Sequence, residues 1–299
     1  MGRQTRRLRG NRVKGQCHPR LVANANADPA ANADAEEEGC IPEKILEDVS
    51  RRIGLSDKKE RSGGARSKPL LKRVAAHFGV DPKNQYSLLQ ALPIDEETKK
   101  RLQKQNLRPV QPASWKHNPD EWLDSNNIRD VMRQYEEARP DFKFLGPYPI
   151  DFAARDPYTK DKAKCLISEL CDLDIDGKDM AGKDYIGIIF NLDPHNKGGS
   201  HWVASFIDIP KKEFIYFDSY GMKPPKQIYR FMQWLTIQEP KMKLRMNGVE
   251  MQKKDSECGM YSMYFIICML EGESFKDFYK RAPSDDFMEK VMRNRLFST

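Results

Sequence analysis

The sequence predicts an α+β domain that follows a small helical module and a disordered arm. Three apolar runs of strand length lie between residues 184 and 218, and segments with helical spacing flank them on both sides. Strands gathered between helices are typical of α+β domains rather than doubly wound ones. The 299 residues, 39% of them apolar, are enough for one or two soluble domains.

Residues 1–65 are predicted to be disordered, apart from a short helix near residues 42–53. Residues 1–20 contain seven basic and no acidic side chains, whereas residues 21–38 are acidic and poor in large apolar side chains. Such a composition cannot build a core. The basic arm is expected to bind nucleic acid, to serve as a nuclear address or to be only a solvated tail.

Residues 66–110 are predicted to form the helical module, and residues 111–299 the α+β domain. In the module, Leu70, Leu71, Val74 and Phe78 recur at helical spacing, and two shorter helices fit residues 86–92 and 96–105. In the domain, Pro147 and Pro149 exclude a regular central strand. The predicted order of elements is a helix at 126–137, strands at 184–192, 201–209 and 213–218, a helix at 226–237, a strand at 244–251 and a helix at Cys258.

The cysteines predict free thiols in a reducing compartment. They contain no CxxC pair and no histidine at zinc-ligand spacing, so neither a zinc module nor a disulfide framework is expected. The six are Cys17, Cys40, Cys165, Cys171, Cys258 and Cys268. The longest apolar stretch, residues 260–270, is too short to cross a bilayer, so no membrane partner is expected.

Polar residues at the ends of the predicted elements indicate nucleophilic catalysis. His201 opens one strand, Asp218 closes the next, and Cys258 precedes a helix. In a hairpin the first two lie at the same edge of the sheet, where Asp218 can orient His201 as a base for the thiol. A thiol with an ordinary pKa of about 8.5 is a weak nucleophile, and a helix N-terminus and an imidazolium both activate it.

A donor for the resulting oxyanion is also needed. Gln252, six residues before Cys258, is the predicted donor together with the Cys258 backbone N–H. Asp255 and Ser256 are predicted to cap the helix. Gly259 is expected to let substrate backbone approach without a Cβ in the way.

The string His201-Trp202, the segment Phe217-Asp218-Ser219, and Gln252 followed by Asp255-Ser256-Glu257-Cys258-Gly259-Met260 resemble a family of cysteine proteases. That family unites the adenovirus protease with the SUMO-deconjugating enzymes. The order of the four polar residues and their spacings agree with it. The resemblance covers residues 110–299 and implies a papain-like fold of the adenain type, with a central mixed sheet and flanking helices.

The resemblance further implies a thiol endopeptidase without a cofactor. By position, Trp122 and Trp202 are expected to wall a tunnel for a Gly-Gly backbone, because flat rings admit residues without side chains. Residues 122–152 also resemble proteases that cut capsid polyproteins of large cytoplasmic DNA viruses. The implied substrates are therefore viral polyproteins or a ubiquitin-like modifier, and the implied locations are the host cytoplasm with its virus factory, the virion and, as an alternative, the nucleus.

Other interpretations remain open from the sequence. The same triad could serve an acetyltransferase, and an idle binding module is the third class. His195 is rejected as the base because it lies in a loop expected to be mobile, and Cys268 is interpreted as a core thiol. Self-cleavage between Gly64 and Ala65 would release the arm.

Overall fold

The computed structural model describes residues 16–21, 39–55, 70–161 and 163–298. These residues divide into two compact units. Residues 114–292 form one, here called the sheet unit, and the described residues of 12–113 together with 293–298 form the other, here called the helical unit. The predicted cleavage site between Gly64 and Ala65 and the arginines at the start of the basic arm lie outside the described residues.

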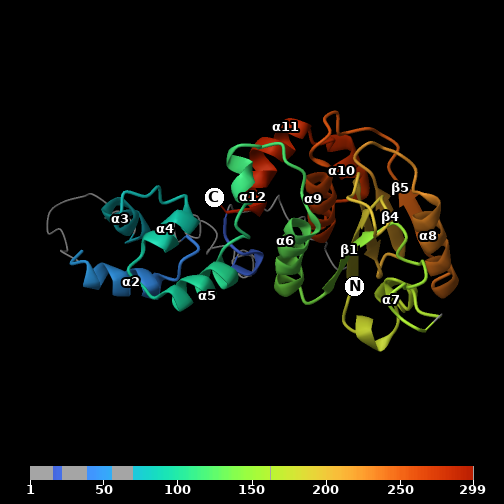
Figure 1. Ribbon diagram of the computed structural model, residues 1–299, viewed down its shortest axis with the longest axis horizontal. Helices are drawn as coiled ribbons and strands as arrows, with labels where there is room; N and C mark the ends of the chain where they lie inside the picture. Colours follow the sequence, from blue (N-terminus) through green and yellow to red (C-terminus); the bar gives the residue numbers. More distant parts are fainter. Residues whose placement is uncertain (1–15, 22–38, 56–69, 162, 299) are drawn as a thin grey trace, which may run out of the picture. The chain divides into compact units, whose positions relative to one another are not determined.

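The sheet unit is built on a five-stranded mixed sheet, which confirms the predicted α+β class (Figure 1). The strands follow one another across the sheet in chain order. The outer pairs are parallel and the two inner pairings are antiparallel. The strands are β1 (Phe142–Pro149), β2 (Tyr185–Asn191), β3 (Trp202–Asp208), β4 (Glu213–Phe217) and β5 (Lys243–Met246).

The edge strand β1 accommodates the two prolines that exclude a central strand. Its register with β2 shifts between Leu145 and Tyr148, around Pro147. Proline has no N–H to donate, so it is tolerated at an edge or a bulge. By contrast, all seven residues of β3 are buried, as its apolar run predicts.

Helices cover both faces of this sheet (Figure 1). On one face α9 (Cys258–Leu270) packs against β3, and Phe265 stacks on Phe217 with ring centres 4.7 Å apart. On the other, Phe231 of α8 (Lys226–Gln238) contacts Phe214 edge to face. Successive strand residues point to opposite faces of the sheet. Phe217 and Phe214 of β4 therefore contact α9 on one face and α8 on the other. Within the described ranges, no helix has the length and apolar character needed to span a membrane.

Further helices complete the sheet unit. α6 (Ser125–Ala138) contacts β1 and begins in a capping box formed by Asp124 and Asn127. The remaining short elements are η1 (Ala113–Lys116), of which residues 114–116 belong to this unit, α7 (Ser168–Cys171), η2 (Lys178–Met180), α10 (Phe275–Arg281), α11 (Asp285–Phe287) and η3 (Met288–Met292).

The helical unit includes part of the arm predicted to be disordered. Its core contains Ile41, Leu46 and Val49, the last two on the predicted short helix. Because the apolar residues of 39–55 recur at helical spacing, they reach this core despite the polar composition of the arm as a whole. The helices are α2 (Glu43–Arg52), α3 (Leu70–His77), α4 (Gln85–Ala91), α5 (Glu96–Asn106) and α12 (Arg293–Leu296).

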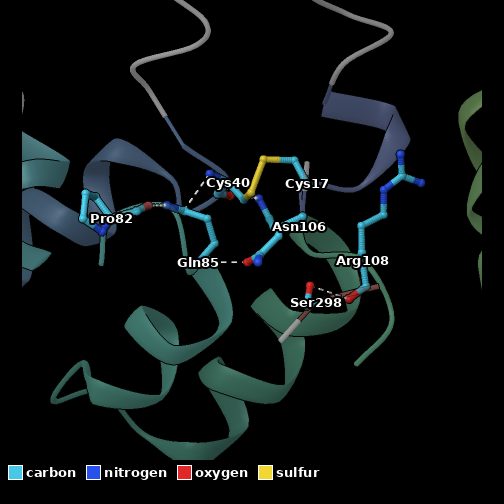
Figure 2. Close-up of a disulfide and its surroundings, with 8 residues drawn as sticks. Cys17, Cys40, Pro82, Gln85, Asn106, Arg108 and Ser298 are labelled. Atoms are coloured by element: carbon cyan, nitrogen blue, oxygen red, sulfur yellow. Dashed lines mark hydrogen bonds between the residues drawn. A yellow bond between two sulfur atoms is a disulfide. The ribbon is translucent and has the colours of Figure 1, made fainter. Parts of the chain in front are cut away.

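Two disulfides contradict the prediction that all six cysteines are thiols. Cys17 is bonded to Cys40 and Cys165 to Cys171. Figure 2 shows the first, where the Asn106 side-chain amide donates to the Cys40 carbonyl at 3.0 Å. A disulfide requires Cα atoms to lie within about 7 Å, a condition that spacing along the sequence does not reveal. Cys258 and Cys268 are the free thiols of the described chain.

Candidate active site

The structure brings His201 and Asp218 together at one edge of the sheet. His201 directly precedes β3 and Asp218 directly follows β4, and these strands form an antiparallel hairpin. The His201 Nε2 atom lies 2.8 Å from Asp218 Oδ1. The carboxylate is fully buried and the histidine is 9% exposed. A base and an orienting acid are therefore held together in a largely buried position.

Cys258 is the first residue of α9, and its side chain lies beside His201, whose pKa it helps to raise. Because Nε2 of the imidazole faces Asp218, Nδ1 is the nitrogen left for the thiol. The cysteine is 2% exposed. The three predicted triad residues thus lie together, with the imidazole between the carboxylate and the thiol.

The surroundings of His201 favour its protonated form. Burial alone would lower its pKa, but the hydrogen bonds to Asp218 and Cys258 and their negative charges raise the pKa to about 9. The ordinary value is 6.5. Near neutral pH the imidazole is therefore an imidazolium that can stabilise a thiolate beside it.

Two residues that the sequence analysis missed hold Asp218. Asn247, just after β5, accepts from the Asp218 N–H at 2.9 Å and donates to its carbonyl at 2.6 Å. The Tyr220 N–H donates to Asp218 Oδ1 at 2.8 Å. Asn247 falls inside the strand predicted at residues 244–251, so it was given no role. The Asn247-Gly248 pair, which is typical of turns, is the signal that could have identified it.

Gln252 is fully buried in the loop between β5 and α9. Its Oε1 accepts from the Ser219 hydroxyl at 2.7 Å. Its Nε2 donates to the Lys254 carbonyl at 2.6 Å and to the Tyr220 hydroxyl at 3.3 Å. The amide is therefore fixed in orientation, while its role as oxyanion donor stays a prediction.

The predicted capping of the Cys258 helix is wrong. Glu257, rather than Asp255 or Ser256, occupies the N-cap position of α9, and it makes no side-chain cap hydrogen bond. A capping side chain accepts from the N–H groups of the first turn. Without that cap, these N–H groups and the positive end of the helix dipole are available to a developing anion near Cys258.

The two predicted tunnel tryptophans line one cavity of about 400 Å³, together with His201. Trp202 is buried, and its indole N–H donates to the Leu123 carbonyl at 2.9 Å. Trp122 is 46% exposed. The cavity adjoins the candidate base, so it is the natural place for a substrate backbone.

Gly259 has a packing role that the sequence analysis did not predict. A Cβ at this position would lie 3.0 Å from Leu123 Cδ1 and 3.3 Å from Trp202 Cδ1. The space beside Gly259 is therefore filled by neighbouring side chains. Glycine lets the start of α9 approach the segments that carry both tryptophans.

Of the two residues that the sequence analysis rejected, His195 as the base and Cys268 as the nucleophile, only Cys268 lies in the surroundings expected of it. His195 is held by Asp151, which accepts from its N–H at 2.9 Å and lies 2.7 Å from its Nδ1. The expectation that this loop could not hold a histidine is therefore wrong, although His201 is the histidine that meets the thiol. Cys268 is buried, and burial raises its pKa, as expected of a core thiol.

Comparisons with known proteins converge on one family. Residues 154–296 match the model of the Ulp1 protease family, C-terminal catalytic domain. A protein of Acanthamoeba polyphaga mimivirus named as a thiol protease is 36% identical over 160 residues, 52% of this chain and 50% of that protein. A SUMO-1 cysteine protease of African swine fever virus is 32% identical over 118 residues, 37% of this chain and 43% of that protein.

The matched segments thus span half or less of these two relatives. Among solved structures, the crystal structure of the African swine fever virus protease superposes with a TM-score of 0.57 at 20% identity, covering 95% of this chain and 96% of that one. At this identity the likeness concerns the fold. His201, Asp218, Gln252 and Cys258 all lie inside the matched family segment, and Trp122 lies outside it.

Proposed function

We infer that residues 154–296 make this chain a member of the Ulp1 family of cysteine proteases, and on that premise we propose that it is a thiol endopeptidase. The observation that carries the proposal is the buried grouping of Asp218, His201 and Cys258, in which Asp218 Oδ1 lies 2.8 Å from His201 Nε2 and Cys258 acts on the same imidazole. An acid beside a base, and a base beside a thiol, is the arrangement that nucleophilic acyl transfer requires.

In this reaction His201 takes the proton of the Cys258 thiol, and Asp218 stabilises the imidazolium that forms. The thiolate sulfur adds to the scissile carbonyl carbon. His201 then returns the proton to the leaving amine as the C–N bond breaks, which leaves a thioester on Cys258. Attack by water on that thioester releases the acid product and restores the thiol.

The negative oxygen formed by addition needs donors. The Gln252 amide and the Cys258 backbone N–H are proposed for that role. The uncapped start of α9 supports it, because no N-cap side chain accepts from the first-turn N–H groups.

The cavity beside Trp122 and Trp202 supports substrates with small residues at the cleavage site, Gly-Gly above all. Two substrate classes fit this proposal. The family description and the SUMO-1 protease named above favour a ubiquitin-like modifier. The viral source of both relatives favours a polyprotein of a large DNA virus, processed in the host cytoplasm or the virion.

The test uses a Gly-Gly-containing peptide and a SUMO precursor, each incubated with the full chain and analysed by mass spectrometry. We expect cleavage after the second glycine by the wild type and none by Cys258→Ala. An acetylated product, with acetyl-CoA present and without cleavage, would instead identify an acetyltransferase. No product in any mixture would favour the binding module.

Nucleic-acid binding by the basic arm remains a separate proposal. It rests on the seven basic residues of 1–20. An affinity for DNA that falls with salt in the full chain and is lost when residues 1–15 are deleted would support it.

A further inference from the structure

Tyr220 contacts the acid–base pair and the proposed oxyanion donor through three different groups. It lies two residues after Asp218, in the turn that follows β4. The Gly221 N–H donates to the Asp218 carbonyl at 2.8 Å and closes this turn. Gly221 has a φ of 71°, a conformation that favours glycine. The turn therefore fixes the backbone position from which the Tyr220 side chain extends.

The backbone of Tyr220 acts on the orienting acid. Its N–H donates to Asp218 Oδ1 at 2.8 Å, and the same oxygen meets His201 Nε2 at 2.8 Å. The carboxylate is therefore held by a donor other than the histidine. This contact depends on the main chain and is independent of the side chain at position 220.

The ring of Tyr220 acts on the base. It stacks on the His201 imidazole, with centroids 4.8 Å apart and planes inclined by 29°. An aromatic face packed on an imidazolium restricts rotation of the imidazole and attracts its positive charge. The ring thus fixes the plane in which Nε2 meets Asp218 and Nδ1 is left for the thiol.

The hydroxyl of Tyr220 acts on Gln252. It donates to the Lys254 carbonyl at 3.1 Å and accepts from Gln252 Nε2 at 3.3 Å. The amide has two protons, and the other one is held at 2.6 Å by the same carbonyl. The longer contact is the weaker one. The proton on the Tyr220 side is therefore the one that can be shared with an oxyanion, while the hydroxyl keeps the amide plane aligned.

We infer that Tyr220 is a positioning residue that aligns His201 through its ring and Gln252 through its hydroxyl. The inference rests on the proposed function, since it assigns these two groups their roles in the reaction. It also divides the side chain into two parts with separable effects. The other titratable groups that act on Tyr220 are Asp255, Cys258 and Asp285, and its pKa is raised to about 12 by burial and by their charges. The hydroxyl is therefore protonated throughout the working range.

Tyr220→Phe tests the hydroxyl. We expect kcat for the Gly-Gly peptide to fall about fivefold to tenfold with KM unchanged, the loss expected of one neutral hydrogen bond. In a Gln252→Ala background the same substitution should have no further effect, because the group that the hydroxyl aligns is gone. Tyr158→Phe, at a tyrosine that is 85% exposed, is the matched control and should keep the wild-type kcat.

Tyr220→Leu tests the ring through a readout that needs no substrate. The rate of Cys258 alkylation by iodoacetamide is measured against pH, with the modified peptide identified by mass spectrometry. We expect alkylation near neutral pH to slow by about threefold to tenfold, because a less aligned imidazolium stabilises the thiolate less. The profile of Tyr220→Phe, which keeps the ring, should match the wild type. Tyr220→Met replaces the leucine variant if circular dichroism shows that it does not fold.

Two results would overturn the inference: additive losses in the Tyr220→Phe, Gln252→Ala pair, or an alkylation profile that is unchanged when the ring is removed. Both are distinct from failure of the proposed function. If the wild type cleaves no substrate, the protease assignment fails, and the alkylation profiles still decide whether Tyr220 positions His201.

Discussion

At His201, two opposing effects set the pH range in which the imidazole is charged. Burial lowers its pKa, and the contacts with Asp218 and Cys258 raise it to about 9. Since the imidazolium is the acid that protonates the leaving amine, activity should persist up to that pH and fall above it. We predict an alkaline limb of kcat/KM near pH 9, measured on the Gly-Gly peptide.

The Asp218→Asn variant supplies the control for this limb. It removes a charge that raises the pKa of His201, so the limb should move to lower pH, in the direction of 6.5. A limb that stays near pH 9 in this variant would show that another group titrates there.

The two free thiols differ in what their loss should do. Cys258→Ala removes the nucleophile, and turnover should disappear while the fold remains. Cys268→Ala should keep activity and lower the free energy of unfolding by about 1 kcal/mol, because it leaves a small cavity in α9. Peptide cleavage and urea unfolding measure the two effects. Equal inactivation of two correctly folded variants would contradict the assignment of Cys258.

Gln252→Ala should lower kcat by roughly 10²-fold to 10³-fold with little change in KM, since an oxyanion donor acts in the transition state. The Ser219 hydroxyl, its partner at 2.7 Å, loses its acceptor in this variant. Thermal melting therefore accompanies the kinetics. A wild-type kcat in the folded variant would remove Gln252 from the reaction.

At the scale of elements, Asp285 holds the loop that carries Gln252. Its Oδ2 accepts from the N–H groups of Lys253 and Lys254 at 2.8 and 3.0 Å, and its Oδ1 accepts from the Tyr261 hydroxyl at 3.0 Å. The carboxylate of α11 thus connects this loop to α9. It is nearly buried, so its loss leaves several donors unsatisfied.

We therefore predict that Asp285→Ala reduces kcat through the loop while Cys258 stays accessible to iodoacetamide. The matched control is Asp286→Ala, at the neighbouring carboxylate, whose ion pairs with Lys254 and Lys290 are exposed. Similar kcat values for both variants would show that the hydrogen bonds of Asp285 to this loop do not matter for turnover.

The elements that the sequence predicted best are those with a clear apolar period. The runs now seen as β2, β3 and β4 and the helices α6 and α8 lie within one or two residues of their predicted bounds. The predicted hairpin was by itself enough to predict that His201 and Asp218 lie close together. β5 ends at Met246, short of the predicted residue 251, because the chain turns there through Asn247, which bonds Asp218.

Contacts made by loops could not be predicted in the same way. Tyr220, Asn247 and Asp285 reach the site from turns and from a distant short helix, and no periodicity marks them. The same holds for the disulfide between Cys17 and Cys40, since spacing does not encode proximity. For residues 39–55 the sequence predicted the short helix but not its place in a core, because the average composition of the arm conceals the apolar face of that helix.

At the scale of the molecule, the unfolding of the two units can be measured separately. All four tryptophans, Trp115, Trp122, Trp202 and Trp234, belong to the sheet unit, whereas the disulfide of Cys17 and Cys40 belongs to the helical unit. Replacing both cysteines by serine should lower the free energy of unfolding of the helical unit by about 3 kcal/mol, as expected for a loop of this length.

This prediction is measured in urea with two probes. The transition seen by circular dichroism should gain an earlier phase, and the tryptophan fluorescence transition should stay in place. The corresponding double substitution at Cys165 and Cys171, in the sheet unit, should affect the fluorescence instead. Identical shifts in both probes would show that the units unfold together.

The last described residues return to the helical unit. Ser298 pairs with Val110, its N–H donates to the Pro109 carbonyl at 2.8 Å, and its carbonyl accepts from Gln111. Leu296 and Phe297 beside it are buried. During synthesis on the ribosome, residues 293–298 emerge only after the whole sheet unit. The helical unit, although begun first, is therefore completed last, and a nascent chain acquires its candidate catalytic residues before that unit closes.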